Sequence, residues 1–481
     1  MVNRSSVDNV IRSAMRAWKI PGVAVAVVQE DDVYLRGYGV KEVGTEDPVT
    51  PNTLFAIASM TKAFTTACMA ILVDEGKMAW DDHPRKYLPY FRLSDPVADA
   101  NVTLRDLVSH RTGMPRHDSL WSVEDRTAEE IVRRYGFAPH STSFRSTYEY
   151  ANVPFSAAGL AVGVAAGSTW QEFVRQRIFE PLGMSTATCR VHDTEASPDH
   201  SHGHVPHKGK VLVVPIREQD NSTAAGAINA SATDMSKWIR LHLNDGEFEG
   251  KQIISKKNLD ETKKPNMVIP VENPDKYGID HGTNLSAYCM GWSKMEYRGE
   301  IVITHGGWLR GFTSNTTLIP RTKTGITVLT NIAMDGPSTC LANGIRDVIL
   351  GLPKRNWNAD VKTIHKAQRL EEKEKKAKEV RHTRTRPSRA LEAYAGEYED
   401  AAYGTVVICL EDGVLGFKYG AAEYKLKHVH FDTFVGKSAH PEEWADMKVM
   451  FSLGPDGEPA SVKTLEPGFQ VEFGKAKPDG K

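Results

Sequence analysis

The chain has 481 residues, which is enough for two or three domains that each bury a core. Hydrophobic residues make up 40% and charged residues 25% of it, as is ordinary for a soluble globular protein. The formal net charge of −1 excludes a global field that would attract nucleic acid or an anionic membrane, so we expect neither as a partner.

The N-terminal segment and the cysteines bear on the location of the protein. Residues 1–20 carry apolar residues at helical spacing and lack the apolar run and small-residue cleavage site of a signal peptide. The cysteines are odd in number and widely scattered: Cys68, Cys189, Cys289, Cys340 and Cys409. Such a set fits free thiols in a reducing compartment better than a disulfide framework. We therefore expect a cytoplasmic protein, although a chain with a trimmed leader would have the same sequence.

The sequence pattern of residues 1–355 predicts a domain with strands near both ends of this segment and helices between them. After a first helix, residues 22–40 form two β-branched runs around an acidic turn, which indicates a hairpin. The pattern is mainly helical from about 60 to 245, and strands return beyond 285 before a closing amphipathic helix at 337–352. One antiparallel sheet flanked by terminal helices, with an inserted helical region, is an α+β fold. The crevice between the sheet and the inserted region is the expected place for a site.

The composition changes twice after this domain. Residues 356–389 are a charged segment, and from 365 onward ten Lys or Arg stand against four Glu. A basic patch for a polyanion is one interpretation, and a solvated helical linker is the one we favour. Residues 390–481 alternate short β runs with turns, which predicts a small antiparallel sheet or barrel.

The first candidate for chemistry is Ser59-Met60-Thr61-Lys62, where the strand-rich start gives way to a long helix. A serine in the first helical turn has its hydroxyl near unpaired N–H groups, and a lysine three residues on emerges on the same face. An amine held among apolar neighbours can lose its proton and act as a base toward the hydroxyl. The alternative is a helix-capping serine with an exposed lysine. The flanking sequence "LFAIASMTKAFTT" is small and apolar, which favours the buried pair.

The second candidate is Tyr150-Ala151-Asn152, at the start of another apolar helix. A tyrosine there can relay protons between a serine, a lysine and a leaving group. An asparagine two residues on can bind both the lysine and a substrate carbonyl. Taken alone, this spacing is more typical of an ordinary loop.

Three segments are candidates for a third motif of the site, beside the serine–lysine and tyrosine–asparagine motifs. His305-Gly306-Gly307 follows an apolar strand, and the glycines allow a close backbone approach. Lys323-Thr324-Gly325 lies in turn sequence between two strands, so we expect it about one strand length, roughly 20 Å, from His305. His207-Lys208-Gly209 lies in a polar segment that we expect to be a loop without a preceding strand. We therefore assign the third place to His305.

In this order the motifs resemble the serine β-lactamase and penicillin-binding-protein superfamily, and most closely its class C β-lactamase-like branch of esterases and D-aminopeptidases. Segments such as "LVSHRTGMP" (107–115) and "AAGAINASATDMSKW" (224–238) add to the resemblance, which covers about residues 8–352. Residues 390–481 resemble the small lipocalin-like barrel that some members carry, on strand rhythm and domain order.

The resemblance implies a role for each matching residue. Ser59 is the nucleophile, Lys62 its base, and Tyr150 the proton relay and general acid–base. Asn152, His305 and Gly307 line the site and position the substrate. The oxyanion hole is formed by the backbone N–H groups of Ser59 and Trp308. No cofactor or metal is implied.

The histidine departs from the lysine that the superfamily commonly has in the third motif. A histidine is mostly neutral near pH 7, so its hold on a substrate carboxylate is weaker. We therefore place ester or peptide hydrolysis, with D-amino-acid-containing peptides among the substrates, above β-lactam hydrolysis. Acyl transfer by the same chemistry, and a sensor that is acylated without turnover, remain alternatives. We expect the partner to be a small-molecule or peptide substrate. The sequence does not decide whether the chain forms homo-oligomers.

Two further features allow more than one interpretation. The histidines of "PDHSHGHVPHKGK" include a possible structural zinc site, but no Cys or Glu stands at ligand spacing. His110 is more typical of a buried hydrogen-bonding residue than of a catalyst. The C-terminal module is compatible with covering the cleft, binding a ligand or mediating oligomers.

Overall fold

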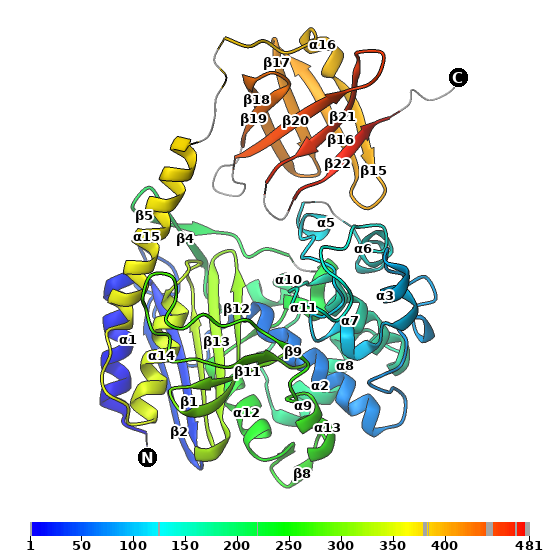
Figure 1. Cartoon of the computed structure of the whole chain (residues 1–481). Helices are drawn as coiled ribbons and strands as arrows, with labels where there is room; N and C mark the ends of the chain where they lie inside the picture. The colour runs from blue at the N-terminus through cyan, green and yellow to red at the C-terminus, as the bar shows by residue number, and fades with distance from the viewer. Residues whose placement is uncertain are drawn as a thin grey trace.

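The computed structural model describes residues 2–123, 126–218, 220–378, 382, 384–438, 446–466 and 469–476 (Figure 1). Its main sheet is antiparallel and has the strand order β2-β1-β14-β13-β12-β11-β10-β9. The strands are β1 Gly22–Gln29, β2 Asp32–Gly39, β9 Met267–Val268, β10 Ser286–Tyr288, β11 Ser293–Tyr297, β12 Glu300–Leu309, β13 Phe312–Ile319 and β14 Thr324–Thr330. The sheet thus joins the N-terminal hairpin to the last strands of the catalytic region, as predicted.

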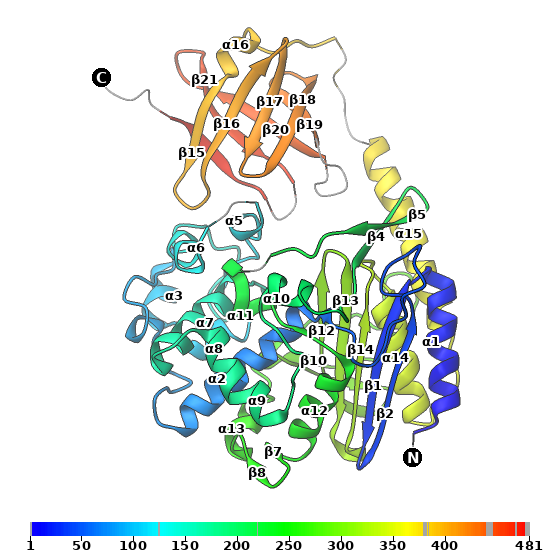
Figure 2. The ribbon, with the colours of Figure 1, turned by 180° about the vertical axis from the view of Figure 1, so that it is seen from behind.

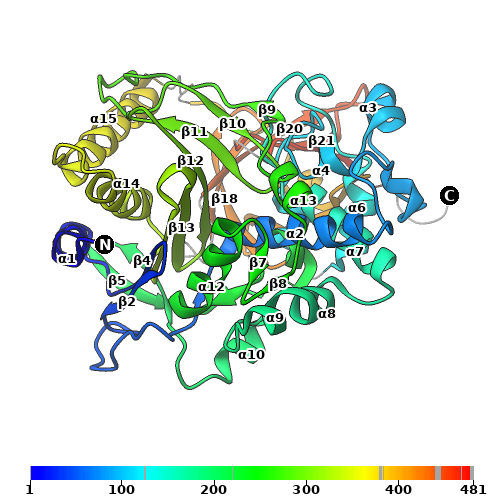
Figure 3. The same cartoon turned by 90° about the horizontal axis from the view of Figure 1, so that it is seen from below.

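Both faces of the sheet are covered, which explains the uninterrupted apolar sequence of β1. Successive side chains of a strand point to opposite faces. Val23, Val25 and Val27 enter a core shared with the terminal helices α1 (Arg4–Trp18) and α14 (Pro337–Ile349). The alternate residues Ala24, Ala26 and Val28 enter the larger core on the side of the inserted helices. Figure 3 shows α1 and α14 on one face and α12 and α2 on the other.

The inserted region is mainly helical. Its helices are α2 Thr61–Asp74, α3 Pro96–Asn101, α4 Leu104–Leu107, α5 Ser119–Ser122, α6 Ala128–Tyr135, α7 Val153–Ala166, α8 Trp170–Val174, α9 Glu180–Leu182, α10 Val191–Glu195, α11 Thr223–Gly226, α12 Ala232–Leu243 and α13 Lys256–Glu261. Short strand pairs interrupt it: β3 Phe55–Ala56 with β6 Asn229–Ala230, β4 Gly203–His207 with β5 Lys210–Val214, and β7 Glu247–Phe248 with β8 Lys251–Gln252. No single described helix is long and apolar enough to cross a membrane, although the bent pair Val153–Ala166 and Trp170–Leu182 meets the criteria of length and composition jointly.

A long helix, α15 (Trp357–Lys378), leads out of the catalytic region, and α16 (Leu391–Tyr394) precedes a closed antiparallel barrel (Figure 2). The barrel strands are β15 Gly396–Asp400, β16 Gly404–Glu411, β17 Val414–Tyr419, β18 Ala422–His430, β19 Thr433–Ser438, β20 Met447–Leu453, β21 Pro459–Thr464 and β22 Glu472–Lys475. Pairing of β15 with β22 closes the barrel, so no edge strand is left open. The predicted fold class, an α+β domain followed by a small β-barrel, is confirmed.

Aromatic side chains fill the barrel interior. Tyr398, Phe417, Phe434, Phe451 and Phe473 are all buried, with 3% exposure or less. The rings of Phe434 and Phe451 meet edge to face at 5.7 Å between centroids. Such a core is packed like that of any small globular domain.

The barrel is docked against α5 and α6 of the catalytic region (Figure 1). The Tyr403 hydroxyl lies 2.7 Å from His117 Nδ1, and Arg126 donates to the Tyr403 carbonyl at 2.6 Å. The backbone N–H of Ala421 donates to the Val123 carbonyl at 2.8 Å. Side-chain and backbone bonds together fix the barrel to the segment that runs from 117 to 126.

Candidate active site

Ser59 lies in a single 3₁₀ turn, Ala58–Met60, that runs directly into α2. The turn begins at Ala58 in a left-handed conformation, with φ of 49°. A non-glycine residue at positive φ is uncommon and costs about 1 kcal/mol or more, so surrounding contacts must hold it. Ser59 therefore stands just before the helix and not within its first α-turn, and its side chain is half-buried.

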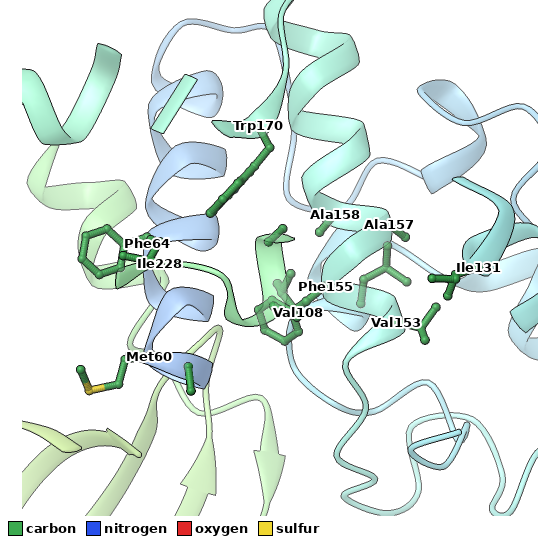
Figure 4. Close-up of a cluster of buried hydrophobic side chains, with 14 of the residues drawn as sticks. Met60, Phe64, Val108, Ile131, Val153, Phe155, Ala157, Ala158, Trp170 and Ile228 are labelled. Carbon is green, nitrogen blue, oxygen red and sulfur yellow. The ribbon is translucent and has the colours of Figure 1, made fainter. Parts of the chain in front are cut away.

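Lys62 is fully buried one turn further on. Figure 4 shows apolar side chains on both sides of the start of α2, with Met60 and Phe64 on one side and Phe155 and Val153 of α7 on the other. Burial among these groups disfavours the charged amine and lowers the pKa of Lys62 well below its usual value, with a further contribution from the Arg116 charge. Burial therefore favours the neutral amine over the charged one.

The partners of the Lys62 amine determine where its lone pair points. Nζ lies 2.8 Å from Asn152 Oδ1 and 2.8 Å from the Ala225 carbonyl oxygen, and 3.0 Å from Ser59 Oγ. The first two partners are acceptors only, so each takes one of the two N–H groups of a neutral amine. The lone pair that remains faces the Ser59 hydroxyl, as a general base requires.

Tyr150 completes the arrangement from a separate segment just before α7. Its hydroxyl donates to Ser59 Oγ at 2.8 Å. Burial raises the pKa of Tyr150 to about 12, although the bond to Ser59 and the nearby Arg116 charge oppose the rise. The phenol is therefore protonated near neutral pH, and Ser59 Oγ accepts from Tyr150; once Lys62 is neutral, the Ser59 proton can turn to the amine.

Asn152 has its amide between Lys62 and a carboxylate. Its Nδ2 donates to Asp118 Oδ1 at 3.1 Å, while Oδ1 accepts from Lys62. The guanidinium of Arg116 lies over the Tyr150 ring at 4.9 Å and donates from Nε to Asp118 Oδ2 at 2.6 Å. This group brings a half-exposed positive charge beside the tyrosine.

His305 lies on β12 and is buried, with 7% exposure. Its Nδ1 is 2.7 Å from the Gly306 carbonyl oxygen, which can only accept, so Nδ1 carries the proton. Nε2 must then accept from the Tyr288 hydroxyl, 2.9 Å away. Burial and the nearby Lys62 lower the pKa of His305 to about 3, so the ring is neutral with both nitrogens engaged.

The strand after His305 approaches the nucleophile turn closely at Gly307. A Cβ at Gly307 would lie 2.1 Å from the Ile57 carbonyl oxygen, so only glycine fits. Leu309 and Phe312 are the last pair before the two-residue turn between β12 and β13. The backbone N–H groups of successive β12 residues point alternately toward β13 and away from it. The Trp308 N–H therefore points away from β13. The β11 partner ends at Ser293 opposite Thr304, so that N–H has no strand beside it.

Lys323-Thr324-Gly325 lies at the other end of the sheet. Thr316 of β13 is in register with both His305 and Thr327, and Lys323 precedes Thr327 by four residues. At usual strand spacings this places Lys323 about 13 Å along and about 10 Å across from His305. Its carbonyl accepts from the Glu30 backbone at 3.1 Å. Lys323 ends the turn and Thr324 and Gly325 begin β14, so the motif lies outside the site, as predicted.

The prediction of a plain loop around His207-Lys208-Gly209 is wrong. His207 ends strand β4, and Lys208 and Gly209 form the turn to β5 with φ of 47° and 82°. Two left-handed residues suit a tight hairpin, but lysine is not a typical residue there, so no hairpin signal is visible in the sequence. The turn lies beside the end of α1, where Lys19 donates to the Gly209 carbonyl.

The other histidines have structural contacts. His204 is buried between the Val43 N–H at 3.0 Å and the Asn331 carbonyl at 2.7 Å. Among the described residues no group of three or more His, Cys, Asp or Glu side chains could hold a metal ion. His110 is buried, and its Nδ1 accepts from the Ala151 N–H at 3.2 Å, which holds the backbone beside Tyr150.

Sequence reasoning missed three side chains of this site. Asp118 and Arg116 stand directly after the family-like segment 107–115, and that position is the one signal that could have drawn attention to them. Tyr288 comes from β10, a weak strand with no motif around it. Trp292 is buried against His242 and does not line the site, whereas Trp308 is 59% exposed.

Comparison with known proteins agrees with this fold. Residues 7–348 match the family model described as Beta-lactamase. The chain belongs to the beta-lactamase family. Residues 380–477 match a second model, described as a domain of unknown function.

Relatives and solved structures extend the comparison over the whole chain. The Unguisins hydrolase ungD of Aspergillus violaceofuscus is 28% identical over 97% of this chain and 88% of its own. The octameric penicillin-binding protein homologue from Pyrococcus abyssi has a TM-score of 0.63 at 20% identity and covers 98% of this chain, with all of its own chain matched.

Two further structures share the catalytic fold and cover 72% of this chain. One is a D-amino acid amidase from Ochrobactrum anthropi, with a TM-score of 0.59, 22% identity and 98% of its own chain matched. The other is a class C beta lactamase from Rhodobacter sphaeroides, with a TM-score of 0.60, 19% identity and 99% matched. Hydrolases recur among these proteins, which supports an enzyme.

Proposed function

We propose that this protein is a serine hydrolase that cleaves amide and ester bonds, D-amino-acid-containing peptides among them, through an acyl-enzyme on Ser59. The observation that carries the proposal is the Lys62 amine. Two acceptors that cannot donate hold its N–H groups, so its lone pair faces the Ser59 hydroxyl at 3.0 Å. That geometry is what a general base needs before it removes a proton.

The proposed acylation begins when Lys62 Nζ takes the Ser59 proton and Oγ attacks the substrate carbonyl carbon. The charge that develops on the carbonyl oxygen is stabilised by the N–H groups of Ser59 and Trp308, each worth about 10²–10³ in rate. As the tetrahedral intermediate collapses, the Tyr150 phenol gives its proton to the departing amine or alcohol and is reprotonated from Lys62. A water molecule then attacks the acyl carbon, its proton passes to the same pair, and that pair returns a proton to Ser59 Oγ as it leaves.

The charge distribution supports peptide or ester substrates over β-lactams. A β-lactam carries a carboxylate, and His305 offers it neither a positive charge nor a free N–H. The name of the fungal relative, a hydrolase of unguisins that matches almost the whole chain, supports hydrolysis as the reaction.

The test is a substrate panel under one condition: p-nitrophenyl esters, D- and L-amino-acid amides, linear and cyclic peptides with D-residues, and a chromogenic cephalosporin. We expect turnover of amides and esters with the cephalosporin slowest. Added alcohol or amine separates acyl transfer from hydrolysis by product analysis. A cephalosporin turned over far faster than every other substrate would overturn the ranking, and stoichiometric labelling without turnover would replace the enzyme with a sensor.

A further inference from the structure

The segment Arg116-His117-Asp118-Ser119 lies between the catalytic site and the barrel, and its side chains face both. Arg116 and Asp118 face the site, where they meet Tyr150 and Asn152. His117 faces the barrel. None of these residues belongs to the motifs that define the family resemblance.

The Asp118 carboxylate accepts three hydrogen bonds. Oδ1 accepts from Asn152 Nδ2 at 3.1 Å and from Trp121 Nε1 at 3.0 Å, and Oδ2 accepts from Arg116 Nε at 2.6 Å. A carboxylate with this many donors is held in one orientation, and its side chain is only 30% exposed.

The orientation of the Asn152 amide depends on this carboxylate. The two ends of an amide have nearly the same shape, so only hydrogen bonding decides which end faces which neighbour. Asp118 accepts and never donates when ionised, so Nδ2 faces it and Oδ1 faces Lys62. With the amide reversed, Nδ2 would confront the amine, and the Lys62 lone pair would turn to Nδ2 and away from Ser59.

We propose that Asp118 is a positioning residue of this site, which fixes Asn152 so that Lys62 acts on Ser59, and that the barrel holds Asp118 in place. The inference rests on the proposed serine-hydrolase function and adds to it a residue and a role for the C-terminal module. Neither follows from the family motifs.

The barrel holds the residues on both sides of Asp118. His117 Nε2 lies 3.0 Å from the Pro139 carbonyl oxygen and must donate to it, so Nδ1 accepts from the Tyr403 hydroxyl at 2.7 Å. The Tyr419 hydroxyl lies 3.3 Å from the Ser119 carbonyl oxygen. The described interior of the barrel holds many aromatic rings, and the module's contribution here is a docking surface.

Charge gives the inference a signature that a merely structural role lacks. The groups around Lys62 are Ser59 on its own turn, and Tyr150, Asn152, His110, His305, Tyr288, Arg116 and Asp118 from the neighbouring segments. Both histidines have a lowered pKa and are neutral. The charges left are those of Asp118, which raises the pKa of Lys62, and Arg116, which lowers it. Removing either charge should therefore move the acid limb of the pH profile, in opposite directions.

The experiment uses the full-length protein and p-nitrophenyl butyrate, with fluorophosphonate labelling of Ser59 as a second readout. Asp118→Asn keeps an oxygen for Asn152 and removes the charge, so we expect the acid limb of kcat/KM to move to lower pH, on the order of one unit. Arg116→Met should move it to higher pH. Asp118→Ala also frees the amide, and kcat should fall about tenfold to a hundredfold with a smaller change in KM. Glu129→Gln, an exposed pair member on α6, is the matched control.

The barrel contact is tested by Tyr403→Phe, which removes one hydroxyl and keeps the ring. We expect a severalfold loss of kcat and of labelling rate at unchanged thermal stability. Tyr424→Phe, a half-buried barrel tyrosine against Phe417, is its control. If the Asp118 variants keep the wild-type pH profile, or Tyr403→Phe behaves like Tyr424→Phe, the inference is wrong while the proposed function stands. Wild-type turnover by Ser59→Ala would instead remove the proposed function itself.

Discussion

Replacement of Lys62 is the change whose consequence the geometry defines most sharply. Lys62→Met has nearly the same length and shape and lacks the amine. The general base should contribute about 10²–10⁴ in rate, so the acylation rate should fall by that factor. This loss is equivalent to a rise of about 3–5 kcal/mol in the activation free energy of acylation. Folding should survive, because the loss of three hydrogen bonds is offset by the desolvation cost that a buried amine no longer imposes.

The assay separates base loss from misfolding. Stopped-flow mixing with p-nitrophenyl acetate gives the acylation burst, and thermal unfolding reports whether the variant is folded. Lys62→Arg is the companion variant, because a guanidinium keeps hydrogen-bond donors but cannot accept a proton. Wild-type burst rates in a folded Lys62→Met or Lys62→Arg protein would refute the reasoning.

Four further outcomes follow from the same geometry. Tyr150→Phe should lower the acylation rate with amides at least a hundredfold and spare the acylation burst with p-nitrophenyl esters, whose leaving group needs no proton; equal losses in both acylation rates would contradict this. Gly307→Ala places a Cβ 2.1 Å from the Ile57 carbonyl oxygen and should abolish activity, whereas Gly306→Ala, with 3.6 Å to its nearest neighbour, should be tolerated, and the ratio of their kcat/KM values decides the point. The kcat/KM of the wild type should rise with pH as the buried Lys62 amine loses its proton, at a pH well below the usual range for lysine. It should then stay high toward pH 10, because the pKa of Tyr150 is about 12. A fall in kcat/KM between pH 7 and 9 would conflict with these two shifts. Lys323→Ala should leave kcat/KM unchanged, and a large loss would mean that the turn motif reaches the substrate.

Much of the fold could be read from local patterns because its main strands are strongly apolar and its motifs lie at element boundaries. The run around Val25 is buried on both faces, and such a strand is visible as an uninterrupted β-branched sequence. Ser59 and Lys62 were predictable because one helical turn separates them, a relation that sequence spacing fixes.

Some contacts of the site depend on tertiary packing, so local sequence patterns do not predict them. Asp118 approaches Asn152 across 34 positions, and Tyr288 reaches His305 from another strand. Neither contact leaves a periodic trace, because each depends on how loops and edge strands pack. The hairpin at Lys208-Gly209 was missed for a local reason, since its turn uses a lysine where Asn or Gly is usual.

The central claim is that Ser59 carries the acyl group. Intact-protein and peptide mass spectrometry after brief exposure to an ester or peptide substrate measures this directly, because it reports the residue modified and the mass transferred. The account predicts one acyl group on the peptide that contains Ser59, lost again as product forms. An adduct on another residue, or continued turnover in Ser59→Ala with no adduct at all, would contradict it.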